Sequence, residues 1–254
     1  MLLASKLPDP TKTVRELALE IPNATRIFER MKIDYCCGGN KSLEEACATA
    51  GVEVAELGRL FAQATESDAP LNALLDFQNL TVTDLIGHIL AKHHVYTKEE
   101  MARLQPLIEK VIRAHGENHP ELRHIGELFQ RLCADLTPHM YKEENVLFPY
   151  IEELEASLLQ NRPVPFAPFG TVNNPIRMMM MEHDTAGDLL RELRALSSDY
   201  AVPADGCISY QTLYHALEAF EKDLHQHIHL ENNILFPRAV EMESKLQNSA
   251  GIRL

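Results

Sequence analysis

The sequence carries one phrase twice, HMYKEENVLFP at residues 139–149 and HIHLENNILFP at residues 227–237. The match extends upstream, since an Asp-Leu pair begins four residues before the first histidine of each copy. The shared pattern D-L-x-x-H-x-x-x-E-x-N-[VI]-L-F-P is too long an ordered agreement to arise by chance. We therefore interpret the chain as two related halves.

Long windows rich in Leu, Ala, Glu, Lys and Arg dominate the 254 residues, and alternating β-branched segments are rare. The sequence therefore predicts an all-α fold. Because the halves are related, the long helices are expected to form an up-down four-helix bundle. Their approximate ranges are 82–114, 120–158, 175–200 and 209–245. Proline is expected to kink the second and fourth helices, at Pro149 and Pro237.

Two domains are expected. Residues 1–68 are predicted to form a small helical domain, and residues 78–245 are predicted to form the bundle. The stretch TESDAPLN at 65–72 is interpreted as the linker between them.

Helix signals are clear in the small domain. Pro22 is expected to open one helix, and Ser42-x-x-Glu45 is a capping box for another helix that Gly51 ends. Between these helices lies the glycine-containing turn DYCCGGN at residues 34–40.

The formal net charge of −13 opposes binding to nucleic acid or to an anionic membrane. No apolar run reaches the roughly 18 residues of a transmembrane helix, and the N-terminus lacks the features of a signal peptide. We therefore expect a cytoplasmic protein that binds neither nucleic acid nor membrane. In that compartment the five cysteines are expected to stay reduced.

Each copy of the repeat places a histidine four residues before a glutamate, which puts the two side chains on one helix face. The pairs are His139 with Glu143 and His227 with Glu231. If the halves pack about a pseudo-twofold axis, both pairs meet in the bundle core. Buried carboxylates and imidazoles need partners. Their mixture suits iron, manganese or zinc.

Two more histidine ligands are expected from the first and third helices of the bundle. The third helix contains His183, and a similar spacing counted back from His139 leads to His93 or His94. Periodicity leaves both candidates open. Four histidines and two glutamates are enough for two metal ions, each with two imidazoles, bridged by both carboxylates.

Three further carboxylates are predicted to orient the ligands, because metal-bound histidines usually donate their second N–H to a carboxylate or carbonyl. Asp135 and Asp223 lie one helical turn before the histidines of the repeat, and Glu182 directly precedes the third-helix histidine.

These features resemble the hemerythrin-like superfamily and, over nearly the whole length, the iron-sulfur cluster repair di-iron proteins. One feature is DYCCGG at 34–39, typical of that family's small appended domain. The other is the ligand series His94, His139, Glu143, His183, His227 and Glu231. The resemblance implies a non-haem di-iron site, with both glutamates bridging the irons and the histidines as terminal ligands. It also favours His94 over His93.

The function implied by the resemblance is repair of iron-sulfur clusters damaged by nitric oxide or oxidants, through donation of iron. Activity toward nitric oxide at the same site is also implied. The expected partners are damaged iron-sulfur proteins and a small gas, nitric oxide or oxygen. A homodimer in which the cysteine domains meet would fit. No residue is assigned a catalytic role.

The alternative is a sensor or store for nitric oxide or oxygen. Oxygen-carrying hemerythrins have a further histidine one turn after the third-helix ligand, where this chain has Ala186 and Gly187. Fewer ligands leave a more open site, which argues against reversible oxygen carriage. A di-metal hydrolase or oxidase is another alternative, but it would need a substrate cleft.

The adjacent thiols Cys36 and Cys37 have two interpretations. Thiols near helix ends ionise readily and can bind metal or exchange. They are therefore a candidate site for transient binding of iron, of a damaged cluster or of a partner. The alternative is a buried structural turn.

Overall fold

The computed structural model describes residues 8–21, 23–67 and 77–251. The described residues form helices and turns without any strand, apart from one bridge pair between Thr13 and Ser42. The predicted all-α fold is confirmed. Contacts within the chain divide it into two units, one of residues up to Thr81 together with Ile228–Ile234, and one of Val82–His227 together with the residues from Leu235 onward.

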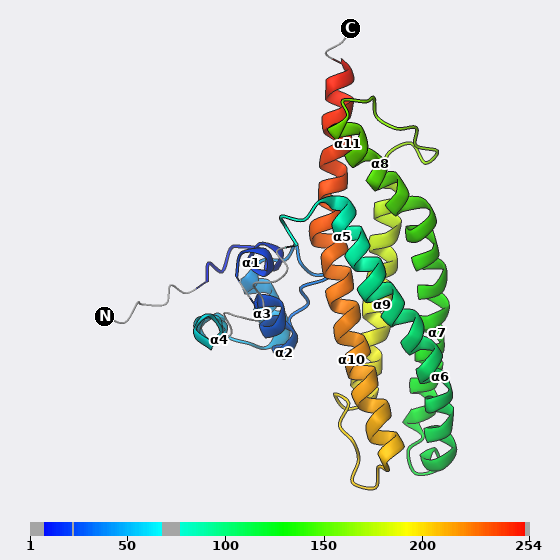
Figure 1. Cartoon of the computed structure of the whole chain (residues 1–254). Helices are drawn as coiled ribbons and strands as arrows, with labels where there is room; N and C mark the ends of the chain where they lie inside the picture. Colours follow the sequence, from blue (N-terminus) through cyan, green and yellow to red (C-terminus); the bar gives the residue numbers. More distant parts are fainter. Residues whose placement is uncertain (1–7, 22, 68–76, 252–254) are drawn as a thin grey trace. The chain divides into compact units, whose positions relative to one another are not determined.

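Up to Thr81, the described residues of the first unit form four short helices (Figure 1). Apolar side chains from all four form its core, in which the ring of Phe28 meets the ring of Phe61 edge-on at 5.6 Å. The helices are α1 (Val14–Glu20), α2 (Ala24–Arg30), α3 (Leu43–Ala50) and α4 (Val54–Ser67).

Local signals set the ends of these helices. The capping box of Ser42 and Glu45 is present at α3, and Gly51 ends that helix with a φ of +69°. A second capping box at α1, which the sequence analysis missed, joins Thr13 and Glu16. Pro22 lies outside the described residues. Of the expected linker, residues 65–67 belong to α4 and the remainder lies outside the described residues.

The second unit is a four-helix bundle, as predicted, in which α7 packs against α6 and α9. Figure 1 shows its long rods lying side by side. The first rod is α5 (Val82–His88), η1 (Ile89–His94) and α6 (Val95–His115); the second is α7 (Glu121–Lys142), η2 (Glu143–Leu147) and α8 (Phe148–Leu159); the third is α9 (Asn173–Leu196); the fourth is α10 (Ile208–Leu230), η3 (Glu231–Leu235) and α11 (Phe236–Gly251). The fourth rod includes Ile228–Ile234, the segment whose contacts group it with the first unit.

The elements η1, η2 and η3 are π-helical turns inside otherwise continuous rods. In η2 the amide of Phe148 donates to the carbonyl of Glu143, five residues back. Pro149 and Pro237 each lie just after such a turn. A proline has no N–H for the carbonyl four residues before it, which favours a wider turn there. The irregularity that the sequence predicted at these prolines therefore takes the form of a π turn.

The bundle core lies along α6, α7, α9 and α10 and is filled by Leu, Ile, Phe and Tyr side chains, including an edge-on pair of Phe129 and Phe220. Each fully buried Leu or Ile contributes about 1.5–3 kcal/mol. This apolar core holds the rods in register, so that residues far apart in the sequence meet. Among the described residues, no helix has both the length and the apolar character that crossing a bilayer requires.

Candidate metal centre

All six proposed ligands lie on the inner face of the bundle rods, and each is at most 2% exposed. Glu143 and Glu231 are the first residues of η2 and η3, and His94 is the last residue of η1. The π turns therefore fall at the residues that the sequence analysis singled out. The remaining three are His139 in α7, His183 in α9 and His227 in α10.

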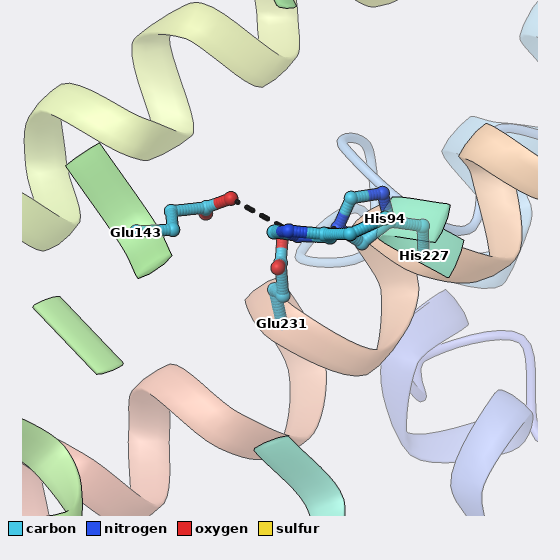
Figure 2. Close-up of side chains that lie close together, drawn as sticks. All are labelled: His94, Glu143, His227 and Glu231. Carbon is cyan, nitrogen blue, oxygen red and sulfur yellow. Dashed lines mark hydrogen bonds and ion pairs between the residues drawn. The ribbon is translucent and has the colours of Figure 1, made fainter. Parts of the chain in front are cut away.

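Two groups of side chains share both glutamates. One group is His94, Glu143, His227 and Glu231, and the other is His139, Glu143, His183 and Glu231. Within each group the candidate ligand atoms all lie within 4.8 Å of one another. Figure 2 shows the first group, in which both carboxylates point toward the two imidazoles.

The imidazoles meet through their Nε2 atoms. The Nε2 atoms of His94 and His227 are 3.1 Å apart, and those of His139 and His183 are 3.0 Å apart. An octahedral ion with bonds of about 2.1 Å would separate neighbouring ligand atoms by about 3.0 Å. Glu143 Oε2 lies 3.5 Å from Nε2 of His94 and 3.3 Å from Nε2 of His139. The donor atoms therefore fit a metal ion in each group.

The Nδ1 atoms of two ligands face carboxylates that lysines hold in turn. Nδ1 of His94 lies 2.7 Å from Glu144, which accepts a hydrogen bond of 2.6 Å from Lys98. Burial opposes ionisation of Glu144, yet hydrogen bonds from Lys98 and His94 hold its pKa below the ordinary value. The imidazole is thereby held with Nε2 directed at the centre.

His139 has a matching arrangement. Its Nδ1 lies 2.8 Å from Glu182, which also accepts a hydrogen bond from Lys142. The hydrogen bond from His139 lowers the pKa of Glu182. Two of the four histidines are therefore oriented by a carboxylate and a lysine.

The three carboxylates expected to orient ligands are placed differently from one another. Glu182 lies against His139, whereas Asp135 is exposed. Asp135 is one turn before His139, but it lies on the outer face of the helix. The carboxylate beside His139 is therefore Glu182, where the sequence led us to expect Asp135. Asp223 lies 3.1 Å from Nδ1 of His93. Glu144 could not be predicted from the repeat, because the second copy has Asn232 at that place.

Both histidines that periodicity left open are buried. His94 belongs to the first group of candidate ligands, while His93 stacks against His227 with ring centroids 5.6 Å apart and planes 10° apart. His93 therefore packs behind a candidate ligand. The chain also has no histidine one turn after His183, where Ala186 and Gly187 are both buried.

The thiol turn belongs to the first unit, and none of the five cysteines forms a disulfide. Cys36 is buried and Cys37 is half-buried. The hydrogen bond to Cys37, together with burial, raises the pKa of the Cys36 thiol well above its ordinary value. With Asp34, the two thiols make a third group of candidate ligands.

Two asparagines of the Ile228–Ile234 segment, which belongs to the same unit as this turn, hold it. Asn232 donates to the carbonyl of Cys36 at 3.2 Å, and Asn233 donates to the carbonyl of Tyr35 at 3.0 Å. Asn233 also lies 2.9 Å from Nδ1 of His229, whose pKa burial lowers to about 4. The role of these asparagines could not be predicted from the sequence, because a side chain that supports a distant turn leaves no local pattern.

Both parts of the chain are similar to known protein domains. Residues 85–239 match the hemerythrin HHE cation binding domain, and residues 10–63 match the ScdA_N domain, whose function is unknown. A probable iron-sulfur cluster repair protein of Haemophilus influenzae is 35% identical over 225 residues, which cover 89% of this chain and 95% of that protein. The iron-sulfur cluster repair protein YtfE of Yersinia pseudotuberculosis is 34% identical over 227 residues, covering 89% of this chain and 96% of its own. The chain therefore belongs to the hemerythrin HHE cation binding family, as a relative of the iron-sulfur cluster repair proteins.

Proposed function

We propose that the chain binds two non-haem iron ions and uses iron to repair damaged iron-sulfur clusters. The observation that carries the proposal is the sharing of Glu143 and Glu231 between two groups of buried ligands. Carboxylates that belong to both groups can bridge two ions, and each group adds two imidazoles. Mixed imidazole and carboxylate ligands suit iron. The names of the relatives supply the function of repair.

Each residue then has a distinct task. The two glutamates would hold both ions, and the four histidines would complete the set as terminal ligands. Glu144 and Glu182 keep Nδ1 of His94 and of His139 occupied, so that Nε2 stays directed at the ion. When bound, a carboxylate-bridged iron pair supplies ferrous–ferric redox chemistry and open positions for a small ligand such as nitric oxide.

The small number of protein ligands available to each iron ion favours its release. Each group provides two imidazoles and two shared carboxylates, and the third rod adds no further histidine after His183. An ion with open positions exchanges more readily than one that is fully enclosed. Iron as cargo therefore fits this donor set, and damaged iron-sulfur proteins are the proposed acceptors. A cytoplasmic location, where thiols remain reduced, is part of the proposal.

The test is transfer of labelled iron. The protein is loaded with an iron isotope and mixed with an apo iron-sulfur protein, sulfide and a thiol reductant. The proposal predicts that label moves to the acceptor and restores its activity. The variant with Glu143→Ala and Glu231→Ala should transfer none. A control with Glu109→Ala and Glu241→Ala, which removes two exposed carboxylates, should transfer normally. Iron that binds but stays with the protein would contradict repair by donation and favour a sensor or store.

A further inference from the structure

Three potential ligands gather in the first unit, outside the histidine and glutamate groups. Asp34, Cys36 and Cys37 bring one carboxylate and two thiols together, with their ligand atoms all within 4.8 Å of one another. We propose that this trio is a third metal site, which takes a single thiophilic divalent cation such as Fe²⁺ or Zn²⁺. The inference deepens the proposed function, since such a site would give transferred iron a second place to bind.

The distances within the trio match those of a tetrahedral site. With metal–sulfur bonds of about 2.3 Å, two ligating sulfurs are about 3.8 Å apart, and a sulfur and a carboxylate oxygen are about 3.6 Å apart. The Sγ atoms of Cys36 and Cys37 are 3.7 Å apart, and Sγ of Cys36 lies 3.4 Å from Oδ1 of Asp34. A cation could therefore enter with little movement of the ligands.

The backbone of the turn is fitted closely around these ligands. The amide of Cys37 donates to Oδ1 of Asp34 at 2.9 Å, which fixes the carboxylate beside the thiols. A Cβ atom on Gly38 would lie 2.9 Å from the carbonyl oxygen of Asp34, so only glycine fits. The two glycines of the turn therefore have a specific role, because they allow the close approach that keeps the three ligands together.

Two side chains of η3 complete this support. A Cβ atom on Gly39 would lie 2.9 Å from Oδ1 of Asn233, and Asn232 donates to the carbonyl of Cys36. Both asparagines are buried and directly follow Glu231 in the chain. The trio is thus held by a preformed frame, which lowers the cost of ordering ligands around a cation.

The composition of the trio selects the kind of cation and its lability. Thiolate ligands favour iron and zinc over magnesium or calcium. Three protein ligands leave the fourth tetrahedral position for water or an exchanging ligand, as in sites where ligands turn over rather than in closed structural sites. A cation held in this way can be passed on.

The test is titration of the full-length, iron-loaded protein with Co²⁺ alone. Thiolate-bound cobalt gives a near-ultraviolet charge-transfer band, which imidazole and carboxylate ligands do not give. The proposal predicts that the band saturates at one Co²⁺ per chain. Replacing both thiols (Cys36→Ser with Cys37→Ser) should abolish it without changing the iron content. The control Cys207→Ser removes an exposed thiol elsewhere and should leave the band unchanged.

Asp34→Asn separates ligation from turn structure, because the amide oxygen can still accept from Cys37 while the ligating charge is lost. Since supporting groups around a metal alone are worth about 10–100-fold in affinity, this variant should bind Co²⁺ at least about tenfold more weakly. No band in the wild type, or a band that survives replacement of both thiols, would overturn the proposal.

Iron content and the cobalt titration, measured on the same proteins, distinguish the two proposals, and the Glu143→Ala, Glu231→Ala variant should lose its iron but keep the cobalt band. If the wild type binds no iron but gives the cobalt band, the proposed function is contradicted and the third site is supported. If the wild type binds iron in the bundle but gives no cobalt band, the third site is contradicted and the proposed function is supported.

Discussion

Glu182 and Asp135 are both candidates to orient His139, but substitution of the two carboxylates should affect iron binding differently. Only Glu182 lies against Nδ1 of His139, whereas Asp135 is exposed. Glu182→Ala should weaken iron binding about 10–100-fold, the usual effect of losing a group that orients a metal ligand. The measurement is the rate at which a chelator removes iron. Asp135→Ala is the control and should match the wild type. Rapid iron loss in Asp135→Ala, or wild-type behaviour in Glu182→Ala, would contradict this account.

Cys207 differs from the other cysteines in its ionisation. A hydrogen bond with His115 lowers the pKa of this exposed thiol to about 7, whereas burial raises the pKa of Cys133 to about 11. Because the thiolate is the nucleophile, Cys207 should be the first cysteine alkylated at neutral pH. Its alkylation rate should rise with pH and reach half its maximum near pH 7, as followed by mass spectrometry.

Two variants check the origin of this reactivity. Cys207→Ser should remove the fast phase of alkylation. His115→Ala should move its midpoint upward, toward the value of about 8.5 of an ordinary thiol. A midpoint near that ordinary value in the wild type would be the contrary result.

At the scale of helices, the π turn η3 connects the candidate metal centre with the proline that follows it. Pro237 leaves the carbonyl of Asn233 without the amide that a regular α-helix would supply. Pro237→Ala restores that amide, so the rod should relax toward a regular α-helix and turn Glu231 away from its present direction. We expect lower iron retention after dialysis, with the helix content by circular dichroism unchanged.

Pro106 provides the matched control, because it is an exposed proline inside α6. Pro106→Ala should raise the midpoint of thermal unfolding, since proline is the poorest residue for a helix interior, and should leave iron retention unchanged. Full iron retention in Pro237→Ala would mean that the π turn does not position Glu231.

Helix periodicity explains how much of the centre could be predicted from the sequence. A histidine four residues before a glutamate is a local pattern, and its repetition predicted the bundle and pointed to His139, Glu143, His227 and Glu231. The π turns were not predicted, because the effect of a proline on a helix depends on how the neighbouring rods pack. Glu144 was missed because it lies outside the repeated pattern.

Interactions between distant segments were the other omission. Asn233 could not be recognised from residue spacing as a support for the thiol turn. It lies nearly 200 positions from Tyr35, whose carbonyl it holds, and the two meet only in the folded chain. A sequence pattern reports which residues share one helix face, and it does not report which loop that face supports.

At the scale of the whole molecule, metal binding and folding should be linked. The fold buries the four imidazoles and two carboxylates of the candidate ligand groups in its interior, and a metal that binds only the folded state stabilises it. At a free metal concentration about 100 times the dissociation constant, this stabilisation is about 2.7 kcal/mol. Removal of iron with a chelator should therefore lower the midpoint of thermal unfolding, and readdition of iron should restore it. An unfolding midpoint that does not change with iron would contradict the linkage.

The most direct test of the central claim is the iron content and visible absorption of the purified protein. About two irons per chain, with an absorption band typical of bridged ferric ions, is the predicted result. Glu143→Ala with Glu231→Ala should lose both, while the exposed pair Glu109→Ala with Glu241→Ala should keep both. Protein without iron, or metal content that the Glu143 and Glu231 substitutions do not change, would contradict the assignment of the buried histidines and glutamates as a di-iron centre.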